Sequence, residues 1–150
     1  MSSSARRTAT LATATTLALA AAGAGRLAAE PDATVAPAPG PARVALAPGE
    51  QAAITARLVG QRYHVDDDGR TLWIDDVAGD GPPRVGIVRR DGAALVLQTE
   101  AETVPLVGPL ARPRIAGPGY TVWVIGDIMP RATGGRALQI RRLGVLRRPR

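Results

Sequence analysis

From residue 50 onward, glycine and proline divide the chain into segments that are too short for a long helix. The 150 residues include 17 glycines and 13 prolines. One Asp-Gly pair, at residues 91–92, separates two β-rich runs at 84–90 and 93–100. Asp-Gly tolerates the positive φ angles of a two-residue hairpin turn. The chain is therefore predicted to form β-hairpins joined by irregular loops.

Other segments carry strand signals of the same kind. Residues 51–59 place Ile54, Ala56 and Leu58 on one face by alternation, which predicts a half-buried strand. Residues 61–76 contain two β-rich runs around a second Asp-Gly turn and predict another hairpin. Residues 103–107 predict a short strand, in which Pro105 favours an edge or a bulge.

The last third of the chain predicts the most buried strand. Residues 120–129 are apolar on both faces, which is typical of a central strand. Residues 136–146 pair naturally with that strand. Their apolar positions change parity halfway along, which predicts a bulge near Arg141 and Arg142.

The predicted fold is all-β, a small barrel or sandwich of five to eight strands. It follows an N-terminal signal segment at residues 1–29 and a spacer rich in proline and alanine at 30–49. The β domain spans 50–146, and residues 147–150 form a basic tail. Proline removes backbone donors and favours extended chain, so a disordered or semi-rigid spacer is expected.

The signal segment is predicted from three features in order. Residues 1–7 carry two arginines and no acid, and residues 8–22 are uncharged and mildly apolar. Ala22-Gly23-Ala24 then fits a small-residue cleavage site, with Ala28-Ala29 as a second candidate. We therefore expect an exported protein, periplasmic or extracellular, by either the general secretory or the twin-arginine route. An N-terminal amphipathic helix of the mature fold is the alternative.

Four segments carry a family resemblance: 91–98 (DGAALVLQ), 103–108 (TVPLVG), 116–127 (AGPGYTVWVIGD) and 137–146 (ALQIRRLGVL). They resemble small exported bacterial domains of the oligonucleotide/oligosaccharide-binding (OB) type. The resemblance covers residues 84–146 and consists of fold-forming positions, so it implies a five-stranded Greek-key barrel and no site residue. Residues 108–119 leave no room for the helix that this fold has between its third and fourth strands, so a simple sandwich remains an alternative.

The residue inventory after position 29 excludes several reaction classes. Serine, cysteine, lysine and asparagine are absent, and His64 is the only histidine. The usual activated nucleophiles and Schiff-base residues are therefore missing, as are the ligands of a zinc site. We expect no catalytic residue, metal or cofactor. Without cysteine, burial alone must hold the fold together.

Charge is the least informative part of the composition. The formal net charge is +6, and all 19 basic residues are arginine. Between Glu30 and Leu146 arginines and carboxylates balance, and the excess lies at the chain ends. No basic face is evident, which disfavours nucleic acid as a partner. The tail residues Arg147, Arg148 and Arg150 could contact an anionic surface.

The hairpin at residues 61–76 holds a calcium-like spacing. His64, Asp66, Asp68, Gly69 and Asp75 fall at positions 1, 3, 5, 6 and 12 of such a loop. The first and last positions carry the wrong side chains. A charged hairpin tip with Gly69 in the left-handed conformation is the favoured interpretation, and a weak calcium site at Asp66–Asp68 stays open.

Two of the four aromatic residues lie on facing arms of that hairpin. Tyr63 and Trp73, with Arg70 between them, are the predicted ligand-binding residues, as an exposed platform for a sugar or a base. A cross-strand aromatic pair that stiffens the hairpin is the alternative. Trp123 is expected in the core.

These observations predict a non-catalytic binding or structural module of the cell envelope with an unknown ligand or protein partner. One alternative is a carboxylate-dependent hydrolase that uses two of Glu100, Glu102, Asp75 and Asp127. The other is an OB domain that binds single-stranded nucleic acid by stacking bases on aromatic rings.

Overall fold

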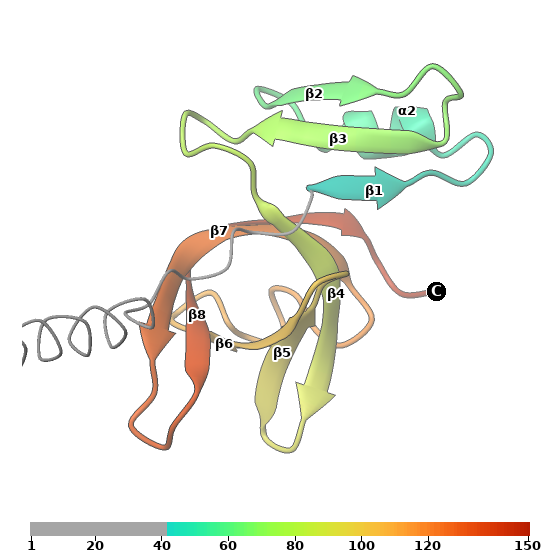
Figure 1. Ribbon diagram of the computed structural model, residues 1–150. Coiled ribbons are helices and arrows are strands. Elements are labelled where there is room, and N and C mark those ends of the chain that lie inside the picture. The colour runs from blue at the N-terminus through green and yellow to red at the C-terminus, as the bar shows by residue number, and fades with distance from the viewer. Residues whose placement is uncertain (1–41) are drawn as a thin grey trace, which may run out of the picture. The chain divides into compact units, whose positions relative to one another are not determined.

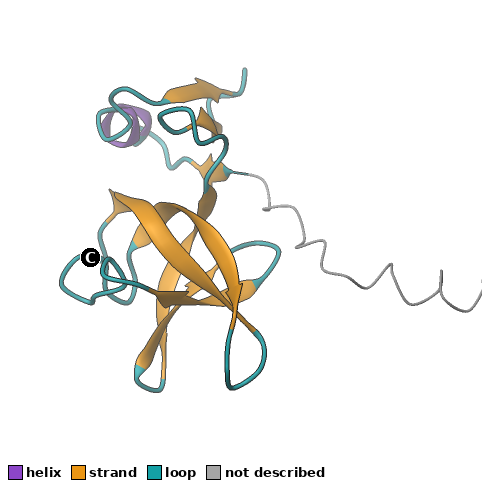
Figure 2. Ribbon diagram, turned by 90° about the vertical axis from the view of Figure 1, so that its left-hand side faces the viewer, coloured by secondary structure: helices purple, strands orange, loops and turns teal. Residues whose placement is uncertain are grey.

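The structure, a computed structural model, describes residues 42–150 (Figure 1). The predicted signal segment and most of the predicted spacer lie outside the described residues. The elements are β1 (Arg43–Ala45), α2 (Gln51–Thr55), β2 (Arg62–Val65), β3 (Thr71–Asp76), β4 (Arg84–Asp91), β5 (Ala94–Gln98), β6 (Thr103–Val107), β7 (Thr121–Pro130) and β8 (Arg136–Arg147). Strands dominate (Figure 2), and the prediction of a small all-β fold is confirmed.

The strands form two sheets. Strands β1, β3 and β2 make a three-stranded antiparallel sheet with β3 in the centre. The other five strands close into a barrel in the order β4-β5-β6-β8-β7. Neighbours in the barrel are antiparallel except β6 and β8, which are parallel. Closure of the barrel leaves no unpaired strand edge in that sheet.

Both predicted hairpins are present. Strands β2 and β3 are joined by a turn in which Gly69 has a φ of 68°, and the β4–β5 turn has Gly92 at 57°. These values lie in the left-handed region, which glycine enters without steric cost. The Asp-Gly pairs therefore marked both turns correctly.

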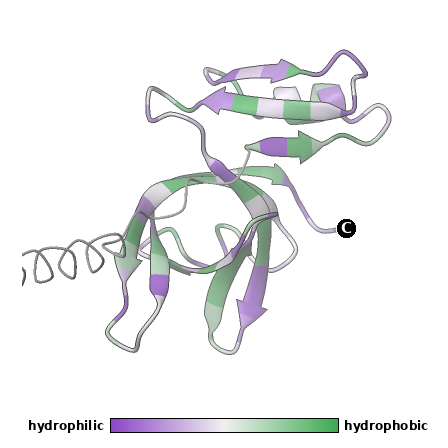
Figure 3. Ribbon diagram, viewed as in Figure 1, coloured by the Kyte–Doolittle hydropathy of each residue, from purple (hydrophilic) through white to green (hydrophobic). Residues whose placement is uncertain are grey.

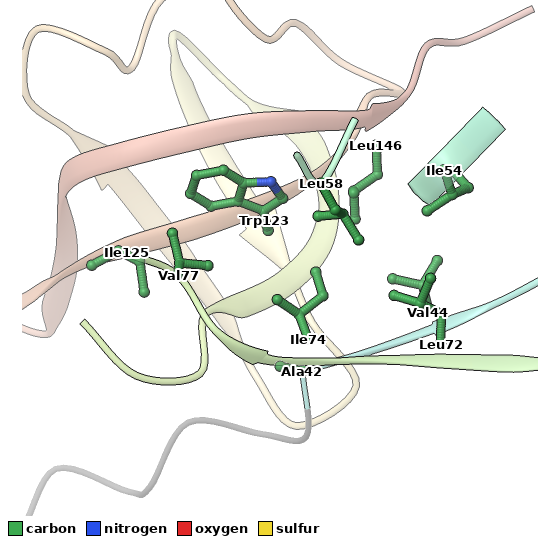
Figure 4. Close-up of a cluster of buried hydrophobic side chains, with 10 residues drawn as sticks. All are labelled: Ala42, Val44, Ile54, Leu58, Leu72, Ile74, Val77, Trp123, Ile125 and Leu146. Atoms are coloured by element: carbon green, nitrogen blue, oxygen red, sulfur yellow. The ribbon is translucent and has the colours of Figure 1, made fainter. Parts of the chain in front are cut away.

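Strand β7 separates two hydrophobic clusters, as its two apolar faces predicted. Figure 3 colours much of this strand as hydrophobic. Val122 and Val124 point into the barrel and pack in its interior. Trp123 and Ile125 point outward into a second cluster, which also holds residues of α2, β1 and β3. Figure 4 shows this second cluster, with Trp123 beside Leu58.

Two bulges in β8 produce the predicted change of parity. Pairing with β7 skips Arg141, which confirms the bulge near Arg141 and Arg142. A second register shift, beside Thr121, leaves out Leu146. Leu146 is almost fully buried and belongs to the second cluster rather than to the barrel interior. Each extra residue changes the face of the strand to which the following side chains point, so β8 contributes side chains to both clusters.

The strand predicted at 51–59 is wrong, because residues 51–55 form helix α2. Ile54 and Leu58 are buried, whereas Ala56 between them is exposed. A spacing of four residues fits one face of a helix as well as alternate positions of a strand. The short run therefore satisfied both patterns, and tertiary packing selected the helix. Among the described residues, no helix has the length and apolarity needed to cross a bilayer.

Three further expectations need correction. The spacer predicted up to residue 49 contains β1, and Ala42 and Val44 are buried against β3 and α2. The predicted tail begins with Arg147, which is still part of β8. Pro105 does not mark an edge, since β6 pairs with β5 on one side and β8 on the other. Its pairing with β8 begins at Leu106, one residue after the proline.

Candidate functional site: a basic surface beside strand β1

The predicted platform of Tyr63 and Trp73 does not form. Across the β2–β3 ladder, Tyr63 lies opposite Ile74, and Trp73 lies opposite His64. Neighbouring positions on a strand point to opposite faces of the sheet. The two aromatic rings therefore belong to opposite faces. A two-residue turn at Asp68-Gly69 gives this same register, so the predicted turn itself was the signal that Trp73 lies opposite His64 and not opposite Tyr63.

Trp73 is flanked by charged or titratable groups on both sides. The His64 ring from β2 stacks on its indole with the ring centres 6.2 Å apart. The Arg43 guanidinium, from β1 on the other side of β3, lies 5.9 Å from the indole centre. The indole Nε1 donates a hydrogen bond of 2.9 Å to Asp66. Trp73 is thus held within a row of side chains rather than presented as a free surface.

The aspartates at the Asp66–Asp68 turn, where the calcium-like spacing falls, accept local hydrogen bonds. Asp66 accepts the bond from Trp73, and Asp68 accepts the backbone N–H of Arg70 at 2.9 Å. Gly69 has the left-handed conformation expected of a hairpin tip. In the part of the chain that the structure describes, no three His, Asp or Glu side chains are grouped to hold a metal ion.

The four candidate hydrolase carboxylates each face a basic group. The shortest separations are Glu100–Arg43 at 2.7 Å, Asp75–His64 at 2.9 Å, Asp127–Arg141 at 3.1 Å and Glu102–Arg136 at 3.8 Å. Among the described residues, none of the three grooves described below is lined by two of these carboxylates. Glycoside hydrolysis needs a pair of carboxylates at one cleft, so this arrangement gives the hydrolase hypothesis no support.

A first groove lies between β1 and the barrel strands β4 and β5. Its volume is about 330 Å³. Arg43, Arg89 and Arg147 line it together with a single carboxylate, that of Glu100. Val85 and other apolar side chains contribute to the same walls. Arg89 donates through Nε to Gln98 at 3.2 Å, and no carboxylate of the described residues lies within ion-pair distance of it.

A second groove adjoins the first. It has a volume of about 560 Å³ and lies between α2 and the end of β8. Four arginines and one carboxylate line it: Arg57, Arg147, Arg148, Arg150 and Glu50. Both grooves share Ala45 and Arg147. We call the two grooves together the basic surface.

The basic surface holds almost all of the excess charge of the described chain. Its six arginines, against Glu50 and Glu100, give a formal excess of four positive charges. The rest of residues 42–150 carries ten arginines and nine carboxylates. The expectation that no basic face exists is therefore wrong. Folding brings the tail arginines beside Arg43, Arg57 and Arg89, which lie far away in the sequence.

Arg147 forms the boundary between the two grooves and is held firmly. Its Nε and Nη2 donate to the two carboxylate oxygens of Glu50 at 2.6 and 2.7 Å, and Nη2 also donates to the carbonyl oxygen of Ala45. Glu50 in turn accepts the backbone N–H of Ala47 at 3.0 Å. The hydrogen bonds from Arg147 are the main reason that the pKa of Glu50 lies below its ordinary value.

This ion pair predicts a specific pH dependence. A lowered pKa in the folded state means that the pair stabilises the fold above the unfolded pKa, about 4.3 for a glutamate, and loses this effect as the pH falls through the folded pKa. Glu50→Gln should therefore unfold at lower urea concentration than the parent at neutral pH. The difference should shrink in acid.

The matched control for that experiment is Asp67→Asn. Asp67 is exposed and forms no ion pair among the described residues. Its substitution should shift the urea midpoint little at either pH. A Glu50→Gln difference that stays constant from neutral pH into acid would contradict the role of the ionised pair.

A larger hollow, of about 1140 Å³, adjoins the basic surface along the β1–α2 loop. Its charged lining residues are Asp68 and Arg70, which balance each other. Arg70 is thus the predicted site residue that does line a groove. Small uncharged side chains make up most of this hollow, so it offers fewer specific contacts than the smaller basic grooves.

The fold and this surface define an all-β barrel protein with a concentrated basic surface. Comparison with models of known protein families, with curated proteins and with solved structures found no match.

Proposed function

We propose that the chain is an exported, non-catalytic binding module of the cell envelope, and that its basic surface binds an anionic ligand. The observation that carries the proposal is the concentration of positive charge in two adjoining grooves. Grooves lined by one sign of charge raise the local concentration of oppositely charged ligands. Arginine also presents paired donors that match carboxylate and phosphate oxygens.

The non-catalytic part of the proposal is supported by chemistry. The chain after residue 29 lacks the side chains used by most nucleophilic enzymes. Three of the four candidate carboxylates, those of Glu100, Asp75 and Asp127, lie within about 3 Å of a basic side chain, at 2.7, 2.9 and 3.1 Å. Export is supported by the charged start, short apolar stretch and small-residue exit of the first 29 residues.

We also propose that the barrel is of the OB type. Five strands in a non-sequential closed order, with one parallel pair between β6 and β8, support this assignment. The segment between β6 and β7 departs from it, because it consists of turns where the OB fold has a helix.

Single-stranded nucleic acid is the second candidate ligand. The basic surface favours it electrostatically. Binding of single strands also uses aromatic rings on which bases stack. No aromatic residue of the described chain lines either basic groove, so a ligand without base stacking fits better.

The test is binding of long-chain inorganic polyphosphate to the purified protein over a range of salt concentrations. We expect affinity to fall steadily as salt rises, because bound counterions are released and charges are screened. Arg89→Gln/Arg148→Gln should weaken binding about 25-fold, at about 1 kcal/mol for each arginine lost from contact with an anion. Both residues are exposed, so the fold should be unaffected.

The matched control is Arg112→Gln/Arg114→Gln. These exposed arginines lie in the loop between β6 and β7, line neither basic groove, and carry the same formal charge. Their removal should change affinity less than about threefold, because only long-range attraction is lost. Equal losses in both double variants would show that net charge, and not the basic surface, governs binding.

A further inference from the structure

The two basic grooves adjoin at two shared residues. Ala45 and Arg147 line both of them, one from β1 and the other from the end of β8. Arg147 is fixed there by Glu50 and by the carbonyl oxygen of Ala45. A ligand that leaves the first groove at this boundary passes over Ala45 and Arg147 and reaches the second groove.

Positive charge is available along the whole path. Arg43 and Arg89 lie in the first groove, Arg147 lies at the crossing, and Arg57, Arg148 and Arg150 lie in the second groove. The carboxylates of Glu100 and Glu50 each already accept an arginine, which lowers their repulsion of an anion. A single small anion would use only part of this path. A chain with anionic groups repeated along its length would use all of it.

The lining residues also indicate the chemistry of such a chain. Neither groove has an aromatic side chain among the described residues that line it, so rings of sugars or bases find no stacking partner there. The first groove adds Gln98 and Thr121, whose side chains can hydrogen-bond to uncharged linking atoms. Arginine forks bind phosphate oxygens in pairs. These features favour phosphate groups joined by short links without rings.

We propose that one linear phosphate polymer without ring units occupies both grooves at once and crosses between them at Ala45 and Arg147. This proposal rests on the proposed function and assigns its ligand class. Occupation of the second groove by a chain already held in the first is an intramolecular step. Its effective concentration makes a spanning chain bind far more tightly than a fragment that reaches one groove.

The experiment is a length series of two polymers, inorganic polyphosphate and poly(glycerol phosphate), from tripolyphosphate or its glycerol equivalent to long chains. Binding to the full chain is measured by calorimetry at fixed salt. Affinity should rise gradually with length and then step up by about a hundredfold once a chain reaches both grooves. Beyond that length the affinity should level off. The polymer with the higher plateau identifies the preferred link between phosphates.

Variants in each groove distinguish a polymer that occupies both grooves from one that is held only by electrostatic attraction to the protein. Arg89→Gln alters the first groove, and Arg148→Gln/Arg150→Gln alters the second; all three residues are exposed. Each variant should reduce or abolish the step in the length series. A fragment too short to reach both grooves occupies only one of them, so its affinity should fall only in the variant that alters that groove. Arg112→Gln/Arg114→Gln should keep the step.

The possible failures are distinct. An affinity that rises smoothly with polymer length, or a step in affinity that survives in both groove variants, would contradict the proposal that one polymer occupies both grooves. The proposal that the basic surface binds anions would still stand. Tighter binding of an alginate or a single-stranded oligonucleotide of equal charge would overturn the ligand class. The absence of binding by every anion, in every form of the protein, would remove the proposed function as well.

Discussion

Replacing Gly144 by alanine should lower the free energy of unfolding by about 3 kcal/mol, the upper range for overpacking a close-packed core. Gly144 lies opposite Trp123 in the β7–β8 ladder, and the indole comes close to it. A Cβ atom on residue 144 would clash with the indole, because it would lie less than 3.0 Å from Cε2, Nε1 and Cζ2 of Trp123. Trp123 cannot yield easily, because it is only 8% exposed and packs within the second cluster.

A double-mutant cycle checks that this contact is the cause. The free energy of unfolding of Gly144→Ala, Trp123→Leu and the double variant is measured by urea denaturation. Trp123→Leu alone should also destabilise, because it leaves a cavity. The added methyl should then occupy part of that cavity, so that the double variant loses less than the sum of the single losses. Strict additivity would mean that the indole does not oppose the new methyl group.

Truncating Leu72 to alanine should cost about 3 kcal/mol, within the range for fully buried leucines. Leu72 is 0% exposed and lies in the central strand β3, between Val44 of β1 and Val65 of β2. The same cluster includes Ile125 of the barrel strand β7. Because the sheet and the outer face of β7 share this cluster, we expect the whole described region to unfold in a single transition rather than the sheet alone.

The two tryptophans allow this to be measured. Trp73 reports on the three-stranded sheet, and Trp123 reports on barrel strand β7 at the cluster that it shares with that sheet. In the Trp73→Phe and Trp123→Phe backgrounds, Leu72→Ala should shift the fluorescence transitions of both reporters by the same amount. Val107→Ala is the matched control, since Val107 is 37% exposed, and it should have little effect. Two separated transitions would show that the sheet unfolds independently of the barrel.

Sequence reasoning succeeded where local rules decide the structure. The Asp-Gly turns, the doubly apolar strand at 120–129 and the parity change near Arg141 all depend on neighbouring residues and on side-chain alternation. Each was found at the predicted place. Local rules were ambiguous at residues 51–59, where Ile54 and Leu58 fit either period. They also missed β1, because three residues among prolines carry too little signal.

Local sequence patterns did not predict most of the basic surface. The tail arginines were identified as possible anion contacts, and that role remains a prediction. Their companions Arg43, Arg57 and Arg89 carried no signal of their own, since arginine is the only basic residue in the chain. The predicted pairing of Tyr63 with Trp73 failed for a different reason. The register set by the Asp-Gly turn places Trp73 opposite His64, and the register shift of this hairpin lies beyond Tyr63, at Arg62.

The amino-acid order alone was enough to establish that this chain builds hairpins without cysteine, with one central strand buried on both faces, because turn formation and alternation act between near neighbours. The location of its positive charge, in contrast, depends on the tertiary structure. Residues from β1, from the region after α2, from β4 and from the last turns of the chain form one basic surface only after the barrel closes and the small sheet packs against β7. Electrostatic potential depends on distance in space, and distance along the chain does not report it.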